Sequence, residues 1–424
     1  MKIFSPAISR LARLRYWRIE LWVKDPVAAQ REVLQDLITH GQYTQIGRKY
    51  QFSTIFTIRK FKELVPIQSY EDLKPYIDEV MQGEADVLWN TPIQWFAKSS
   101  GTTSDKSKFI PLSQESIEDN HFQGSKDVLS IYYNALPESD LLTGKMLVIG
   151  GSHQVHPIKD DIQYGDLSAV LLQNSPIWSG LVRVPELSIA LMDEWESKIE
   201  MLAQSTIQEP VTSIAGVPTW TMVLLKRILQ ITGKKTIKEV WPDFELYIHG
   251  GVSFTPYRAE FKKIIGGDCN YLEIYNASEG FFAAQDRMNE EGMLLFLDHG
   301  IFYEFMPVES YGKENPITIG LDKVELGKNY AIVISTNGGL WRYLGGDTVQ
   351  FVTLNPFRIK VSGRLKQYIN AFGEELIADN SDKAISLTCA SLNVVMKEYT
   401  AAPIFMSDKG AGAHEWLIEF ENVP

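Results

Sequence analysis

The densest group of side chains that could do chemistry lies between Trp95 and Pro111, in the sequence WFAKSSGTTSDKSKFIP. Hydroxyl and backbone N–H groups can surround phosphate oxygens, and a lysine can add positive charge. A P-loop is excluded, because that motif needs a second glycine before its lysine. On its own, the segment fits a solvated Ser/Thr-rich turn equally well. The candidate phosphate-binding residues are Ser99, Ser100, Gly101, Thr102 and Thr103, with Lys106 or Lys108 as the cation.

Five side chains further along the chain have the chemical types that a nucleotide requires. In YNASEG, the Tyr275 ring could stack on a nucleobase, and Ser278 and Glu279 could reach Mg²⁺ bound to phosphates. In LWRYLGGDT, Asp347 follows two glycines and could accept hydrogen bonds from both hydroxyls of a ribose. Arg364 could bind ribose or phosphate. Taken singly, each also fits a capped turn, a hairpin turn or a surface ion pair.

The elements that must position these residues change in character along the chain. Asp25 and Pro26 predict the start of one helix and Ser69 the start of another, so we expect the first ninety residues to be mainly helical. Short apolar runs then alternate with helical patterns, which predicts a substantially parallel α/β sheet with functional loops at its strand ends. From Met293 onward the pattern predicts antiparallel strands, in a barrel or a distorted sheet.

Composition is typical of a globular protein. The 424 residues, 45% apolar and 22% charged, predict two domains or one large layered domain with a small appendage. The two cysteines, Cys269 and Cys389, are far apart and lack partners at ligand spacing. This argues against a disulfide framework or a zinc site, so we expect a cytoplasmic protein. No run approaches the roughly 18 to 20 apolar residues that span a bilayer.

The net charge of −12 is unevenly distributed. The first 60 residues contain eleven Lys or Arg and four Asp or Glu, giving +7, so the remainder carries −19. Near the start, ISRLARLRYWRIELW predicts a basic amphipathic helix. Such a helix could bind a membrane surface or a partner, but we favour a helix packed on its own domain with its Arg heads in solvent. The acidic remainder disfavours nucleic-acid binding.

Taken in order, the segments resemble the Gretchen Hagen family, the auxin-responsive acyl acid amido synthetases and their bacterial relatives, within the adenylate-forming superfamily. FAKSSGTTSDKSKFIP resembles the phosphate loop, HGGVSFTPYR the adenine-side strand end, and YNASEG the adenine and magnesium motif. WRYLGGD resembles the ribose-binding motif, and GRLKQYINAFGEEL the hinge into the lid. Any one motif is weak evidence, but coincidence is improbable for five in the correct order.

The resemblance implies an α/β fold with mixed sheets flanked by helices and a β-barrel-like part. The large ATP- and acid-binding domain is expected to span 1–362, with a helical lead-in at 1–90. A hinge at 363–380 and a small α+β lid at 381–424 should follow. Relatives carry a longer lid with a lysine that assists adenylate formation, and this sequence stops before any such motif. We therefore expect either a truncated lid or impaired activity.

The resemblance also implies the roles of individual residues, with ATP and Mg²⁺ as cofactors. Glu279 and Lys108 would be catalytic, and Glu279 would hold Mg²⁺ through the ATP phosphates. Gly251 and Tyr275 would flank adenine, Asp347 would hold ribose, and Arg364 would sit at the hinge. The implied nucleotide-binding residues are Ser99, Ser100, Gly101, Thr102, Thr103, Gly251, Tyr275, Ser278, Asp347 and Arg364.

The function implied is an ATP-dependent ligase that activates a small carboxylic acid as acyl-AMP and transfers it to an amine, with an amino acid as the expected acceptor. Charge stabilisation and alignment dominate phosphoryl-type transfer, so donors and cations matter more than a nucleophile. This agrees with the lack of a Ser-His-Asp or Cys-His pattern. The alternatives are an acid–coenzyme A ligase of the same superfamily and a nucleotide-binding protein without turnover.

Overall fold

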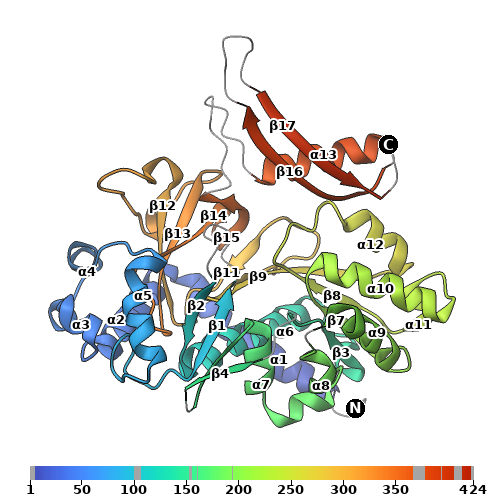
Figure 1. The fold of residues 1–424 in the computed structure, drawn as a ribbon, viewed down its shortest axis with the longest axis horizontal. Helices are drawn as coiled ribbons and strands as arrows, with labels where there is room; N and C mark the ends of the chain where they lie inside the picture. Colours follow the sequence, from blue (N-terminus) through green and yellow to red (C-terminus); the bar gives the residue numbers. More distant parts are fainter. Residues whose placement is uncertain are drawn as a thin grey trace.

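Residues 5–99, 107–151, 155–159, 161–192, 194–365, 378–392, 394–404 and 413–421 are described by the computed structural model of this chain. A body of sheets and helices forms most of the molecule, and the C-terminal elements lie on one side of it, at the top of Figure 1. Strands and helices alternate through the middle of the chain, so the protein has the mixed α/β fold that the sequence predicts.

The first ninety residues are mainly helical, as predicted. The cap at Asp25 accepts a hydrogen bond from the Ala28 N–H at 3.1 Å, and Ser69 forms a capping box with Asp72. These side chains satisfy N–H groups that a helix start leaves without partners. The helices are α1 (Ser5–Lys24), α2 (Pro26–Gly41), α3 (Gln45–Lys49), α4 (Ile58–Leu64) and α5 (Tyr70–Met81).

Parallel strands form one end of the larger sheet, as the strand–helix alternation predicts. In sheet order they are β6 (Arg183–Val184), β3 (Lys145–Val148), β7 (Val211–Ala215), β8 (Leu246–His249) and β9 (Asn270–Ala277). The helices of this region are α7 (Leu167–Asn174), α8 (Leu187–Ala190), α9 (Trp195–Thr206), α10 (Pro218–Thr232), α11 (Ile237–Val240) and α12 (Arg258–Ile265). Apolar side chains of α9, α10 and α12 share one buried core with those of β3, β7 and β8. These helices and strands lie together on one side of the molecule (Figure 1).

Antiparallel strands continue the same sheet beyond β9, which confirms the hairpin pattern predicted from Met293 onward. They follow in the order β10 (Gly280–Ala284), β11 (Met293–Leu295), β15 (Phe357–Arg364), β14 (Tyr343–Leu354), β13 (Asn329–Thr336) and β12 (Ile301–Pro307). Among the described residues this is one open sheet of eleven strands with β12 and β6 at its edges. The strands therefore extend the sheet, and the expected barrel-like part is not seen.

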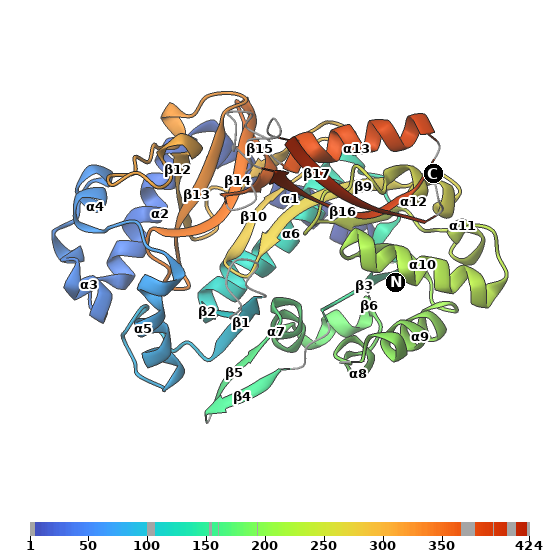
Figure 2. The ribbon, with the colours of Figure 1, turned by 45° about the horizontal axis from the view of Figure 1, so that its top comes forward.

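A second, four-stranded sheet carries the two ends of the Ser/Thr-rich loop. Its strands are, in order, β2 (Lys108–Leu112), β1 (Trp95–Ser99), β5 (Ile162–Gly165) and β4 (His156–Lys159). β4 and β5 project from the body in Figure 2. β1 and β2 are antiparallel, with Ser99 opposite Lys108, so the loop joins two paired strands. A π-helical turn (Ser116–Phe122) and α6 (Gln123–Ala135) follow β2.

The C-terminal elements are a helix and a hairpin. They are α13 (Ala378–Leu392), β16 (Met396–Ile404) and β17 (Ala413–Phe420), a helix and two strands in the region where a small α+β unit was expected. Tyr257 Oη donates to the Lys397 carbonyl at 3.4 Å, and Lys226 pairs with both Glu421 and Glu260. These contacts join the C-terminal unit to α10 and α12. Most of the predicted hinge, 366–377, lies outside the described residues.

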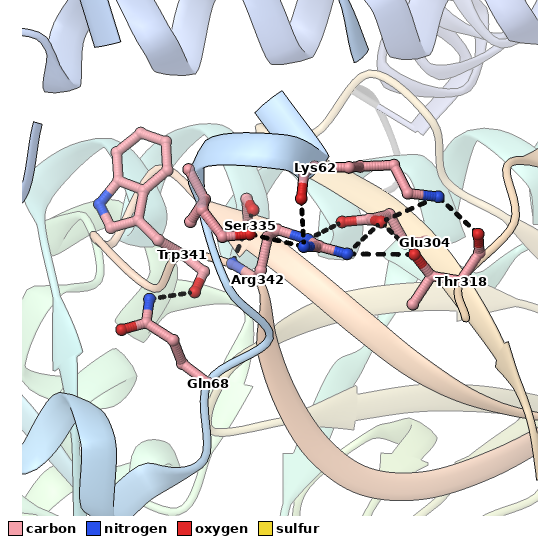
Figure 3. A network of polar contacts seen from close by, with 8 residues as sticks. Lys62, Gln68, Glu304, Thr318, Ser335, Trp341 and Arg342 are labelled. Carbon is pink, nitrogen blue, oxygen red and sulfur yellow. Dashed lines mark hydrogen bonds and ion pairs between the residues drawn. The ribbon is translucent and has the colours of Figure 1, made fainter. Parts of the chain in front are cut away.

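A buried ion pair joins the helical lead-in to the antiparallel strands (Figure 3). Arg342 Nε and Nη2 donate to the two carboxylate oxygens of Glu304 at 2.7 and 2.9 Å. The same guanidinium donates to the Val65 carbonyl at 2.6 Å and to the Thr318 hydroxyl at 3.1 Å. Arg342 is 5% exposed and Glu304 2%. The pair has the bidentate geometry and additional hydrogen bonds that a desolvated ion pair requires.

Gln68 reinforces this connection. Its side-chain amide donates to the Trp341 carbonyl at 2.7 Å (Figure 3), and its backbone N–H donates to the Arg342 carbonyl at 2.9 Å. In return, the Gln68 carbonyl accepts from Leu344 N–H at 2.9 Å. The segment that precedes α5 is therefore fixed to the first residues of β14, the strand that carries Asp347.

Replacing Arg342 by Met should lower the free energy of unfolding by about 3–5 kcal/mol, because Glu304 would keep its buried charge without its main partner. Urea denaturation measures this change. The matched control is Arg287→Met, which breaks the exposed Arg287–Glu290 pair and should cost under about 1 kcal/mol. The double variant Glu304→Gln/Arg342→Met should regain part of the loss. Equal effects of R342M and R287M would contradict this role.

Candidate active site

One cleft of about 1700 Å³ contains every predicted site residue that the structure describes. It opens at the ends of β1, β3, β7 and β8, beside the β9–β10 turn and strands β14 and β15, and Tyr399 of the C-terminal hairpin also lines it. Ser100, Gly101, Thr102 and Thr103 lie outside the described residues, as does Lys106. The described site residues in the cleft are Ser99, Lys108, Gly251, Tyr275, Ser278, Glu279, Asp347 and Arg364.

Asp347 is held by two other predicted site residues. Tyr275 Oη donates to Asp347 Oδ2 at 2.8 Å, and Arg364 Nε lies 2.9 Å from Asp347 Oδ1. Asp347 and Arg364 are cross-strand partners on β14 and β15, whereas Tyr275 comes from β9. The Tyr275 ring is 8% exposed and packs on Phe282 at a centroid distance of 4.7 Å. The carboxylate is thereby fixed in one orientation at the cleft wall.

A bulge in β14 directs Asp347 into the cleft. Ala331 pairs with Thr348 and Val333 with Leu344, so the stretch from Gly345 to Asp347 faces the single residue Ile332 on β13. Gly346 has a φ of +98°, a region that side chains with a Cβ rarely adopt. Bulges of this kind bend a strand and redirect a side chain. The glycine pair in LWRYLGGDT is therefore what allows Asp347 to leave the regular strand.

Glu279 lies at the two-residue turn between β9 and β10 and is half-buried. Desolvation by the cleft walls raises the pKa of this carboxyl, and the negative charge of Asp347 raises it further. The cations Lys108 and Arg364 act in the opposite direction. The charge of Asp347 therefore opposes ionisation of Glu279. A cation bound between the two carboxyls would relieve this repulsion.

Lys108 extends from the start of β2 between two tyrosines. Its Nζ lies 5.7 Å from the ring centre of Tyr70 and 5.9 Å from that of Tyr343. The ammonium also donates to Tyr343 Oη at 3.4 Å. Aromatic faces attract an ammonium group, so the tyrosines hold this charge in the cleft. Tyr70 and Tyr343 were not among the predicted site residues. Tyr343 lies in the segment WRYLGGD, and Tyr70 follows the helix cap Ser69.

His249 is the last residue of β8, and Gly251 lies two residues beyond it. Gly251 has a φ of +84°, which favours glycine. The His249 ring is buried and stacks on Phe254 at 4.1 Å. Burial and, to a smaller extent, the charge of Arg258 together lower the pKa of His249 to about 3. The imidazole is therefore neutral near pH 7 and supplies no charge to this side of the cleft.

A buried lysine supports the far part of the cleft, and the sequence analysis did not identify it. The side chain of Lys198, on α9, is fully buried, and its Nζ donates to the carbonyls of Gly151 at 2.6 Å and Gly150 at 3.3 Å. Both glycines follow β3 and line the cleft. Nearby, Trp195 and Trp220 meet edge to face at 4.0 Å and also line it. This end of the cleft is aromatic.

Among known structures, the fold matches those of an acyl acid amido synthetase and an acyl-CoA ligase. A GH3.15 acyl acid amido synthetase matches 96% of this chain and 81% of its own, with a TM-score of 0.78 and 18% identity. A 2-hydroxyisobutyryl-CoA ligase, crystallised after adenylation with an acyl-AMP, matches 90% of this chain and 75% of its own, with a TM-score of 0.59 and 11% identity.

By sequence, the chain belongs to the GH3 family. The model of the GH3 family N-terminal domain matches residues 15–269, and that of the GH3 family central domain matches 294–364. The Gretchen Hagen resemblance of the motifs is thereby confirmed. The chain is a distant homologue of the characterised amido synthetases.

Curated relatives show the same distance in sequence. An indole-3-acetic acid-amido synthetase, GH3.2 of Arabidopsis thaliana, is 21% identical over 78% of this chain and 72% of its own length. A jasmonoyl–L-amino acid synthetase, JAR4 of Nicotiana attenuata, is 25% identical over 78% of this chain and 67% of its own. A 4-substituted benzoates–glutamate ligase, GH3.12 of Arabidopsis thaliana, is 23% identical over 88% and 75%.

Replacing Glu279 by Gln should stabilise the fold at about pH 7.5. Because the pKa of Glu279 is raised above that of an unfolded chain, its ionised form opposes folding, and wild-type stability falls as the pH rises through that pKa. Wild type and variant should converge near pH 4, where the carboxyl is protonated. Thermal unfolding across this range tests the sign, with the exposed Glu314→Gln as control. A variant less stable than wild type at about pH 7.5 would contradict it.

Proposed function

We propose that this protein activates a carboxylic acid with ATP as acyl-AMP and transfers the acyl group to an amine, with an amino acid as the acceptor. The observation that carries this proposal is the convergence of Lys108, Tyr275, Glu279, Asp347 and Arg364 in one cleft. These residues come from separate parts of a chain that belongs to the GH3 family. Relatives at 21–25% identity include synthetases named for acid–amino acid products.

In the first half-reaction, a carboxylate oxygen attacks the α-phosphate of ATP and pyrophosphate leaves. The new bond is a mixed anhydride between the acid and AMP. Negative charge grows on the phosphate oxygens, so the protein has to supply aligned donors and cations. Lys108 and Arg364 bring positive charge to the cleft, and Ser99 ends the strand that leads into the hydroxyl-rich loop. We assign phosphate binding to Ser99, Ser100, Gly101, Thr102 and Thr103.

Asp347 is assigned to the ribose. A carboxylate held by Tyr275 and Arg364 can accept two further hydrogen bonds from neighbouring hydroxyls without reorienting. Gly251 and Tyr275 line the adjoining wall, where we place the adenine. A glycine with a φ of +84° brings backbone close to a flat ring without side-chain interference.

Glu279 is assigned to Mg²⁺, with Ser278 beside it at the phosphates. The donor set fits this metal, because Mg²⁺ is commonly held by one or two carboxylates together with substrate phosphates. In the described part of the chain, no cluster of three or more His, Cys, Asp or Glu could hold a metal unaided. The raised pKa of Glu279 also supports a cation site here, because a bound cation would relieve the repulsion between the carboxyls of Glu279 and Asp347. When bound, Mg²⁺ would neutralise charge on the phosphates.

The acid is assigned to the aromatic end of the cleft. Trp195, Trp220 and Val217 give this part an apolar wall, and Lys198 fixes the Gly150–Gly151 backbone opposite. In the second half-reaction, an amine attacks the acyl carbonyl and AMP leaves. Rotation of the C-terminal unit about residues 363–380 would convert the site from the first half-reaction to the second. The hydrogen bond from Tyr257 and the ion pair from Lys226 that hold this unit lie at the surface and can be broken.

Acid-dependent release of pyrophosphate is the direct test. Purified protein with ATP and Mg²⁺ should release pyrophosphate with at least one member of a panel of carboxylic acids. Adding amino acids should then yield an amide, identified by mass spectrometry. A thioester with coenzyme A and no amide would overturn amide synthesis in favour of an acid–coenzyme A ligase. Calorimetric ATP binding without pyrophosphate release for any acid would favour a nucleotide-binding protein without turnover.

Replacing Asp347 by Ala should raise the KM for ATP about 10- to 100-fold, because two charge-assisted hydrogen bonds to the ribose would be lost. Tyr275→Phe, which removes one hydrogen bond to Asp347, should have a smaller effect in the same direction. The control is Asp268→Ala at an exposed carboxylate. Pyrophosphate-release kinetics at varied ATP measure KM, and thermal unfolding checks the fold. Wild-type KM values in both site variants would remove Asp347 from the nucleotide site.

A further inference from the structure

Helix α1 has two apolar faces, and its own domain covers only one of them. Ile19 and Trp22 are buried against the body, chiefly on α6. On the opposite side Leu14 is 63% exposed, Trp17 58% and Leu21 49%. These three recur at intervals of three and four residues, so they form one continuous stripe. The packed helix that we favoured from the sequence therefore leaves a large apolar stripe in solvent.

Cations surround this stripe. Arg10, Arg13 and Arg18 are exposed and lie three or four residues from Leu14, Trp17 or Leu21. Glu20 is the one acidic residue within α1. We define the exposed α1 face as Arg10, Leu11, Arg13, Leu14, Trp17, Arg18 and Leu21. Large aliphatic and indole side chains flanked by arginines are the composition of helices that lie in the interface of a membrane.

We propose that the exposed α1 face binds the surface of an anionic lipid bilayer. Leucine and tryptophan side chains would enter the region between headgroups and acyl chains, and the arginines would contact lipid phosphates. The helix would lie along the membrane plane, since no helix in the described ranges is long and apolar enough to cross a bilayer. The proposal is independent of the reaction in the cleft.

Charge distribution favours this occupant over a second copy of the chain. A symmetric dimer through the exposed α1 face would bring the arginines of one copy, Arg10, Arg13 and Arg18, close to the arginines of the other copy. Like charges at such an interface disfavour association, whereas phosphate headgroups neutralise them. Helix α1 contains five Lys or Arg and one Glu, giving +4, in a chain whose net charge is −12, so electrostatic attraction also favours the approach of α1 to an anionic surface.

The face is already formed before it meets a membrane. Arg15, on the buried side of α1, pairs with the buried Asp127 of α6, and Asp127 also accepts from His299 Nε2 at 2.9 Å. This anchor keeps α1 folded and fixes which side faces outward. Binding then avoids the entropic cost that a disordered segment incurs when it folds on a surface.

Vesicle sedimentation tests the proposal. The full chain should bind vesicles of phosphatidylcholine with about 30% phosphatidylglycerol, should bind pure phosphatidylcholine vesicles at least about tenfold more weakly, and should dissociate in about 0.5 M salt. Leu14→Gln/Trp17→Gln/Leu21→Gln and, separately, Arg10→Gln/Arg13→Gln/Arg18→Gln should each lower the partition coefficient at least about tenfold. Circular dichroism checks that these exposed substitutions leave the fold intact.

Matched controls alter exposed residues elsewhere. Phe56→Gln/Ile317→Gln/Leu326→Gln removes three apolar side chains of comparable exposure, and Lys234→Gln/Lys235→Gln/Lys262→Gln removes three exposed charges. Both controls should bind anionic vesicles like wild type. Failure of wild type to bind anionic vesicles, or equal losses in the control variants, would overturn the proposal. Self-association in analytical ultracentrifugation that the Leu14/Trp17/Leu21 variant abolishes would assign the face to a second copy and overturn it too.

Discussion

The buried pair between Arg342 and Glu304 is the constraint on which the geometry of the cleft depends. Two desolvated charges are tolerated only where further hydrogen bonds satisfy them, and here the lead-in supplies one through the Val65 carbonyl. The strand that leaves Arg342 carries Tyr343 and then Asp347. The lead-in segment that begins at Val65 continues to Gln68, which hydrogen-bonds to β14, and then to Tyr70. The early helices are therefore part of the site, because they fix both rings that contact Lys108.

The cleft itself holds an unfavourable arrangement of charge. Two carboxyls lie close enough for one to raise the pKa of the other, and the nearby cations offset this only in part. Such a site costs stability in the free protein, and the surrounding core has to supply that stability elsewhere. The same arrangement favours a ligand that brings a cation and leaves room for hydrogen bonds to the second carboxylate.

Local patterns in the sequence were sufficient for much of the fold. The caps at Asp25 and Ser69 and the change from alternating strands and helices to hairpins are short-range signals, and the structure follows them. Chain order was also sufficient to gather Tyr275, Glu279, Asp347 and Arg364 as candidates. The contacts among them were not predictable, because they depend on a bulge in β14 and on pairing between distant strands. Lys198 gave no signal, since a lysine on an amphipathic helix ordinarily faces solvent.

Arg364 belongs both to the cleft and to the last strand before the C-terminal unit. It contacts Asp347 across the β14–β15 ladder, and it stands at the end of β15, after which the chain continues to α13. In the rotation proposed above, Arg364 is the site residue that lies nearest in sequence to the C-terminal unit. Linkage then operates in both directions: a ligand that binds Asp347 more tightly in one orientation of that unit shifts the orientation by the same free energy. The Arg364–Asp347 ion pair can thus couple the binding of a ligand in the cleft to the orientation of the C-terminal unit.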